Sequence, residues 1–177
     1  PAWNDNNLRS LASHIKTNLF FAHVRATTGT AISRPNCHPF IWKNWTFMHN
    51  GRIGSWNKCR KWFEEHISPD YYHHREGTTD SEALFLVALS HGLTTDPVGA
   101  IQKTIKIALK TMDENHADEP LRASLAVTDG KEIWAFRDSN DTQSPTLYYG
   151  QPHTRAEDQY KNKFNAIASE PSDSEAD

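Results

Sequence analysis

The sequence is poor in cysteine, contains no run of basic residues and has no long apolar segment. Its two cysteines, Cys37 and Cys59, form no CxxC pair and are too few for the disulfide framework of a small secreted protein. We therefore expect reduced thiols and a cytoplasmic protein. Lys and Arg number 19 against 22 Asp and Glu, so the net charge of −3 argues against a nucleic-acid partner. The apolar runs are too short to cross a bilayer, so no membrane partner is expected either.

What the sequence does contain points to an ordinary folded protein. Its 177 residues suit one domain with its own core, and we place that domain at residues 1–171 with an acidic tail at 172–177. Six Trp, eight Phe and five Tyr argue against disorder, because disordered chains are poor in aromatic residues.

Local patterns predict the elements of the N-terminal part. Apolar residues at helical spacing predict a short amphipathic helix near residues 8–15, and an apolar, aromatic stretch predicts a buried strand at 19–25. Small, polar and proline positions over residues 26–44 predict a long loop, which precedes a strand at 45–49. The Asn50-Gly51 pair that follows predicts a hairpin turn, because both residues tolerate positive φ.

The remaining elements follow from caps and periodicity. A helix is expected at residues 55–66, and a second loop at 67–78. Thr79 and Glu82 have capping-box spacing and predict a helix over 79–90, whereas Pro97 begins one over 97–113. After residue 119 the period becomes alternating, with a hairpin at Asp129-Gly130 and strand candidates in 146–150 and 164–169. Strands, then helices, then strands predict an α+β fold.

Four side chains and backbone groups suggest an amino-acid site. Arg25 ends the predicted strand with a planar guanidinium that matches a carboxylate, and Asp80 lies in the first turn of a helix. Taken alone, each is more often a structural salt bridge or a cap. Together they supply the fixed cation and anion that the zwitterionic end of an amino acid requires. The Asn50 amide and the Gly51 N–H are two donors that could form an oxyanion hole.

The order of four short blocks carries a family resemblance. The blocks are AHVRATTG at 22–29, NCHPF at 36–40, MHNG at 48–51 and TTDSE at 78–82. In this order they resemble the class II glutamine amidotransferase domain of the N-terminal-nucleophile type. They are most similar to the YafJ-like branch, which includes ergothioneine-pathway and glutathione-degradation amidohydrolases. The similarity covers about residues 18–171. It implies an Ntn-hydrolase αββα four-layer sandwich, with the helices at 55–66, 79–90 and 97–113 as cover.

The resemblance also implies roles for individual residues. Arg25 would hold the α-carboxylate of glutamine or of a γ-glutamyl group, and Asp80 its α-ammonium group. Asn50 and Gly51 would form the oxyanion hole, and Thr28 would line the glutamine pocket. The family needs no metal or organic cofactor, so none is expected in this chain.

Two histidines of the same blocks receive weaker assignments. His38 and His49 match family positions that would support the pocket from behind. For both residues, a hydrogen-bonded structural histidine is an equally good interpretation.

The chain departs from the family in two places. Synthase-type relatives carry Trp and His where Ala26 and Gly29 stand in this sequence, which favours the YafJ-like branch. The family nucleophile is an N-terminal Cys, whose own amine can act as the base. This chain begins with Pro1, and neither of its cysteines suits that role. We therefore expect an N-terminally incomplete domain whose nucleophile lies outside this chain, so that the fragment alone is inactive.

The expected reaction is hydrolysis of a γ-glutamyl amide through a Cys thioester. Glutamine, a γ-glutamyl peptide and a thiol conjugate all remain open as substrates, and relatives in larger assemblies suggest a homo-oligomer or a partner subunit. The main alternative is a catalytically dead protein that binds glutamine or γ-glutamyl compounds, or a docking subunit. A tautomerase using the Pro1 amine, or a zinc site built from His66, His73 and His74, is a weaker alternative.

Overall fold

The computed structural model describes residues 4–24, 33–151 and 164–170 of the chain. Its helices are α1 (Asn6–His14), α2 (Trp56–Glu64), α3 (Pro69–Tyr72), α4 (Asp80–Ser90) and α5 (Pro97–Glu114), with a short 3-10 helix, η2 (Arg34–Asn36), before the first strand. The strands are β1 (Phe40–Trp42), β2 (Trp45–Arg52), β3 (Arg122–Thr128), β4 (Ile133–Ser139), β5 (Tyr148–Gly150) and β6 (Ala166–Ala168).

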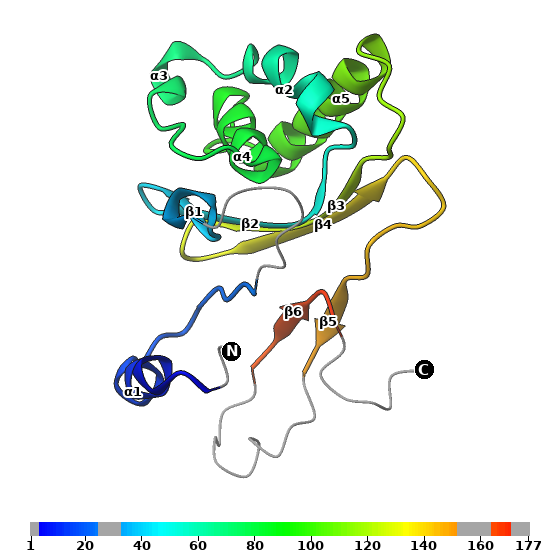
Figure 1. Cartoon of the computed structure of the whole chain (residues 1–177). Coiled ribbons are helices and arrows are strands. Elements are labelled where there is room, and N and C mark those ends of the chain that lie inside the picture. Colours follow the sequence, from blue (N-terminus) through cyan, green and yellow to red (C-terminus); the bar gives the residue numbers. More distant parts are fainter. Residues whose placement is uncertain (1–3, 25–32, 152–163, 171–177) are drawn as a thin grey trace.

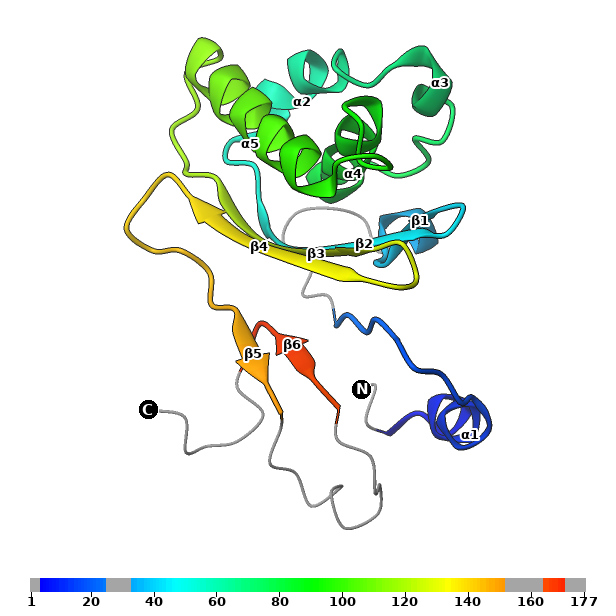
Figure 2. The same cartoon turned by 180° about the vertical axis from the view of Figure 1, so that it is seen from behind.

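A four-stranded antiparallel sheet organises the structure. Its strand order is β1-β2-β3-β4, and helices α2 to α5 form a layer over one face (Figure 1). Strands β5 and β6 pair as a separate two-stranded sheet on the other side, as the reverse view also shows (Figure 2). The helical layer and the antiparallel sheet confirm the predicted α+β class.

Helix α4 forms the centre of the core. All residues from Ser81 to Leu89 are buried, because the helix contacts the sheet below it and α2, α3 and α5 around it. A helix that is apolar on every side is stable only when it is enclosed in this way. Phe85 of α4 stacks on Phe47 of β2, with ring centroids 5.3 Å apart, and so joins the helical layer to the sheet.

Several local predictions are confirmed. The Asp129-Gly130 turn joins β3 to β4, with the Asp129 carboxylate accepting the N–H groups of Lys131 and Glu132. Helix α5 begins at Pro97, as predicted, and the two late strand candidates become β5 and β6. The turn and the start of α5 are specified by neighbours in the sequence, which explains why local patterns identify them.

The predicted turn at Asn50-Gly51 is wrong. Strand β2 runs through both residues to Arg52, and each pairs with a residue of β3. The antiparallel register extends from Thr46 opposite Thr128 to Arg52 opposite Arg122. A strand about 70 positions further along the chain therefore overrides the local turn preference, because it supplies a continuous ladder of backbone hydrogen bonds.

Other predictions for the N-terminal part need correction. Residues 19–24 form no strand with any described segment, and Phe20 and Val24 are 74% and 81% exposed. An apolar stretch becomes a strand only where a neighbouring strand pairs with it. The loop expected over 26–44 contains η2 and β1 within its described portion. Helix α1 forms as expected but buries none of its residues.

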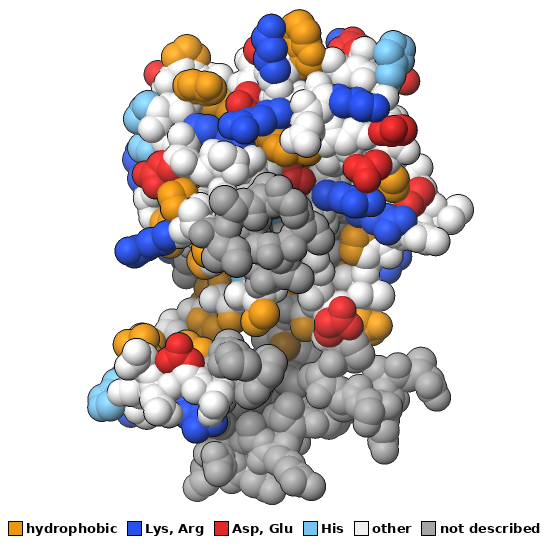
Figure 3. Space-filling model, in the orientation of Figure 1, with side chains coloured by type: hydrophobic (Ala, Val, Ile, Leu, Met, Phe, Trp, Pro, Cys, Tyr) orange, Lys and Arg blue, Asp and Glu red, His pale blue; other side chains and the backbone are white. Residues whose placement is uncertain are grey.

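The described surface carries charges of both signs. On the face shown in Figure 3, Lys and Arg side chains are interspersed with Asp and Glu over the helical layer. Within the described ranges, no helix has the length and apolarity needed to span a membrane. The predicted domain boundary at 171–172 falls outside the described residues and stays a prediction.

Two neighbours on α2 test the core assignment. Phe63 is fully buried, whereas Trp62 is 46% exposed. We expect Phe63→Ala to lower the free energy of unfolding by about 3–5 kcal/mol, because it leaves a cavity in the core. Trp62→Ala should change it by only about 0.5 kcal/mol. Urea unfolding of both variants measures the difference, and equal losses would contradict this packing.

Candidate functional site

A cavity of about 640 Å³ lies beside β2. Strand β1 pairs with β2 only over residues 45–47, so among the described strands none covers that edge of β2 from residue 48 onward. The opening is bounded by the start of α4 and by the residues that lead into α2. Strand β2 contributes His49, Asn50 and Gly51 to the lining, and the start of α4 contributes Thr79, Asp80 and Ser81.

Asp80 brings a carboxylate to this cavity at the first position of α4. Its Oδ2 accepts the backbone N–H of Ile53 at 2.7 Å, and its Oδ1 accepts the N–H of Ser81 at 2.8 Å. The Ile53 contact ties the end of β2 to the start of the helix. The arrangement fixes an anionic group at the cavity wall, where it can pair with a cation such as an ammonium group.

His49 lies behind this wall and is 2% exposed. Its Nδ1 is 2.9 Å from Ser81 Oγ, and its Nε2 is 3.4 Å from the carbonyl oxygen of Arg122. Because a carbonyl can only accept, Nε2 carries the proton and Nδ1 accepts from the hydroxyl. Burial lowers the pKa of His49, and this outweighs the opposing influence of Asp80. His49 is therefore a neutral link between β2, β3 and α4.

Gly51 occupies a position where a side chain does not fit. Its φ is +148°, and a Cβ there would overlap the carbonyl oxygen of Arg122 and lie 2.8 Å from His49 Nε2. Glycine thus lets β2 lie close to β3 and to the imidazole at this point. Asn50, its neighbour on the same cavity wall, is exposed.

His38 closes another side of the cavity together with His23. The two rings stack with centroids 4.1 Å apart, and the His38 and Phe40 rings form a T-shaped contact with centroids 4.7 Å apart. These ring contacts place His38 at the cavity wall, where its predicted supporting role stays a prediction.

An outer wall of charged residues was not found by sequence reasoning. Ser55 Oγ donates to Asp118 at 2.5 Å, and the Ser55 N–H donates to Glu119 at 2.9 Å. The hydrogen bond from the Ser55 hydroxyl is the main cause that lowers the pKa of Asp118, and the hydrogen bond from Lys58 is the next. These residues are more than 60 positions apart in the sequence, and no local motif marks the pairing. They join the turn before α2 to the loop before β3.

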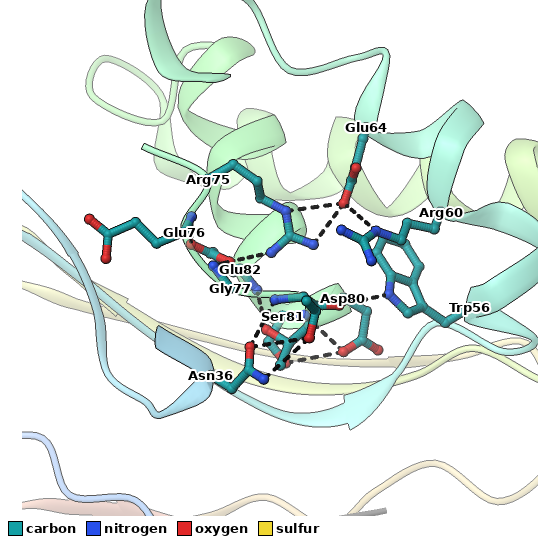
Figure 4. Close-up of polar contacts among 12 residues, drawn as sticks. Asn36, Trp56, Arg60, Glu64, Arg75, Glu76, Gly77, Asp80, Ser81 and Glu82 are labelled. Carbon is teal, nitrogen blue, oxygen red and sulfur yellow. Dashed lines mark hydrogen bonds and ion pairs between the residues drawn. The ribbon is translucent and has the colours of Figure 1, made fainter. Parts of the chain in front are cut away.

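The capping box is only partly as predicted. Thr79 Oγ1 accepts the Glu82 N–H at 3.2 Å, as expected. Glu82, however, does not return to Thr79: its carboxylate accepts the N–H groups of Glu76 and Gly77 at 2.8 and 2.9 Å. Arg75 pairs with this carboxylate and with Glu64 of α2 (Figure 4). The side chain reaches further back because the preceding loop folds against the helix start.

The structure therefore brings five of the seven predicted site residues to one cavity: His38, His49, Asn50, Gly51 and Asp80. The other two, Arg25 and Thr28, lie outside the described residues. In the part of the chain that is described, no three His, Cys, Asp or Glu side chains group as a metal site would require.

The two cysteines are unpaired, as expected. Cys59 is fully buried, and burial raises its thiol pKa. A raised pKa disfavours the thiolate, which is the nucleophilic form. Cys37 is exposed, and neither residue is among those that line the cavity.

Comparisons with known proteins agree on one family. The family model for class-II glutamine amidotransferases matches residues 7–170. A Saccharomyces cerevisiae protein described as a probable glutamine amidotransferase, DUG3, is 36% identical over 158 residues, covering 77% of this chain. The chain spans 43% of the length of DUG3. The structure of a glutamine aminotransferase class-II domain protein from Silicibacter pomeroyi is 42% identical, with a TM-score of 0.75 over 86% of this chain and 67% of that one.

Replacement of Gly51 tests the tight contact in β2. We expect Gly51→Ala to lower the free energy of unfolding by roughly 1–3 kcal/mol, because the new methyl group meets the Arg122 carbonyl at an unfavourable φ. Gly150→Ala is the matched control, since a Cβ there would meet nothing within 4 Å. Denaturant unfolding compares the two variants. A Gly51→Ala protein as stable as the control would show that the contact is not tight.

The neutral state of His49 predicts a pH dependence. Because its folded-state pKa is lowered, the unfolded chain binds more protons just below the usual histidine value of about 6.5. The stability contributed by neutral His49 is therefore present above about pH 6.5 and is lost as the pH falls through the lowered pKa. Subtracting the unfolding free energies of His49→Gln from those of the wild type across pH 4–8 isolates this contribution. A difference that does not change with pH would contradict it.

Proposed function

The chain belongs to the class II glutamine amidotransferases, and we propose that the protein containing it hydrolyses a γ-glutamyl amide at the cavity beside β2. One observation carries the proposal. Asp80 lies about 30 positions from Asn50 and Gly51 in the sequence, yet all three line a single cavity of about 640 Å³. That volume is in the usual range for a small-molecule site.

In this proposal Asp80 binds the α-ammonium group of the substrate. Its carboxylate is held at the start of α4 by the Ile53 and Ser81 N–H groups, so it needs little rearrangement on binding. Arg25 would bind the α-carboxylate, and Thr28 would complete the pocket, as their positions in the AHVRATTG block suggest. A site that holds both ends of an amino acid leaves its side-chain amide directed at a fixed point.

Asn50 and Gly51 would stabilise the oxygen of the reacting carbonyl. A thiolate adds to the carbonyl carbon, and the oxygen takes up the negative charge. The Asn50 amide and the Gly51 N–H donate hydrogen bonds to that oxygen. The C–N bond then breaks, ammonia or an amine leaves with a proton, and a thioester remains. Water attacks the thioester next, which releases the free γ-carboxylate and restores the thiol.

The thiol comes, in this proposal, from a segment outside residues 1–177. Cys59 is buried with a raised pKa, and Cys37 does not line the cavity. The family nucleophile is an N-terminal cysteine, and such a segment would add strands to complete the Ntn αββα sandwich. The likeness to the Silicibacter pomeroyi domain protein supports this arrangement.

The acceptor and the cellular setting are also proposals. Water is the simplest acceptor, which makes the protein an amidohydrolase. The similarity to DUG3 supports an amidotransferase-type reaction, although this chain spans less than half of that protein. We propose a cytoplasmic protein that acts on glutamine or a γ-glutamyl compound, as a homo-oligomer or with a partner subunit.

The decisive experiment uses the full-length protein. It is incubated with glutamine, and glutamate and ammonia are measured. Release of both supports the proposal. Glutamine binding without release would instead identify a binding protein that has lost its activity. If the protein neither binds nor hydrolyses glutamine, and also leaves a γ-glutamyl peptide intact, the proposed substrate class is overturned.

Replacement of Asn50 tests the oxyanion hole in the same assay. We expect Asn50→Ala to lower kcat by about 10²–10³-fold, because one of two donors to the developing oxyanion is lost. KM should change little. Asn44→Ala is the control: its side-chain amide also donates a hydrogen bond, to the Asp129 carbonyl at the remote β1–β2 turn. Equal kcat values for Asn50→Ala and Asn44→Ala would rule out the assigned role.

A further inference from the structure

The side chain of Asn36 connects two loops that both lead to the cavity. It is 2% exposed at the end of η2. Its Oδ1 accepts the backbone N–H of Thr78 at 2.8 Å, and its Nδ2 donates to the Thr78 hydroxyl at 3.2 Å. Asn36 lies two positions before His38, and Thr78 two positions before Asp80. One buried amide therefore joins two walls of the cavity.

The opposite side of the loop before α4 is held as firmly. Glu82 accepts the N–H groups of Glu76 and Gly77, and the Trp56 indole donates to the Thr78 carbonyl at 3.2 Å. With the Asn36 contact, the N–H groups of residues 76, 77 and 78 all have partners within the protein. A segment whose backbone N–H groups are all bonded in this way has few alternative conformations.

The loops also lie too close together for a larger residue between them. A Cβ on Gly77 would be 2.5 Å from Asn36 Oδ1 and 2.6 Å from the Pro35 carbonyl oxygen. Glycine at this position therefore allows the close approach that the Asn36 hydrogen bonds require.

We propose that Asn36 is a positioning residue, which sets the place of the Asp80 carboxylate by anchoring the loop in front of α4. The inference rests on the proposed function, in which Asp80 binds the α-ammonium group of the substrate. Asn36 itself does not line the cavity, so it acts through Thr78 and Thr79.

This role predicts a separation between substrate binding and chemistry. The oxyanion donors belong to β2, which its pairing with β3 holds over residues 46–52. Loss of the anchor should displace Asp80 and leave Asn50 and Gly51 in place. KM for glutamine should therefore rise, whereas kcat should stay close to the wild-type value. General destabilisation of the fold would not raise KM while leaving kcat unchanged.

The test uses the full-length protein with glutamine as the substrate. Asn36→Ala removes the anchor, and Thr78→Val removes the hydroxyl on the exposed side of the same contact without changing the buried residue. We expect KM to rise roughly 10- to 100-fold for Asn36→Ala, the range for a small misplacement of a binding group, and less for Thr78→Val. Asn44→Ala, which loses one side-chain hydrogen bond far from the cavity, should keep the wild-type KM.

Hydrogen exchange gives a second measurement that does not depend on activity. The amides of residues 76–78 should exchange slowly in the wild type and in Asn44→Ala, and faster in Asn36→Ala, while the β2 amides stay protected. An Asn36→Ala protein with unchanged KM and unchanged exchange would overturn the proposal, as would a fall in kcat at constant KM. If Asn36→Ala does not fold, an unchanged KM in Thr78→Val overturns it.

Failure of the proposed function gives a different result. A wild type that releases glutamate neither from glutamine nor from a γ-glutamyl peptide would refute the reaction. Hydrogen exchange would then decide the anchoring role alone: loss of protection at residues 76–78 in Asn36→Ala supports it, and unchanged protection overturns it.

Discussion

Helix α4 begins inside the protein, and the groups at its first turn must find their partners there. An unsatisfied buried N–H or carboxylate is costly, so the helix start determines what packs around it. Glu82, whose side chain is 6% exposed, takes two backbone N–H groups and the guanidinium of Arg75. Arg75 also pairs with Glu64 of α2. The requirement to satisfy one buried helix end therefore joins α2, α4 and the loop between α3 and α4.

The cavity results from the same constraint. The Asp80 carboxylate accepts the Ile53 N–H, so the end of β2 is fixed against the helix start. Because β1 pairs with β2 only over residues 45–47, no described strand covers the β2 edge beyond them, and residues 49–51 of this edge line the cavity. His49 stays neutral behind this edge, since charging it would require a buried cation. A carboxylate and a strand edge with a glycine thus lie next to each other on a rigid support.

Local sequence signals were reliable where the partners of a residue are close in the chain. Asp129-Gly130 forms its turn, Pro97 begins its helix and Thr79 caps α4, because each depends on residues within about four positions. These local signals failed where the outcome depended on whether a strand distant in the sequence pairs with the segment. Asn50-Gly51 continues a strand because β3 pairs with it, and residues 19–24 form none because no described strand does. The Glu82 carboxylate likewise accepts N–H groups from the preceding loop rather than from the cap residue Thr79.

The sequence by itself determined the family, the α+β class and five residues of the cavity wall, since four ordered blocks carry His38, His49, Asn50, Gly51 and Asp80. Only the tertiary structure decided how these residues are held. The contacts of Asn36 with Thr78, of Arg75 with Glu64, and of Ser55 with Asp118 cross between elements. Such pairs depend on the path of the chain between them, and no spacing in the sequence encodes that path.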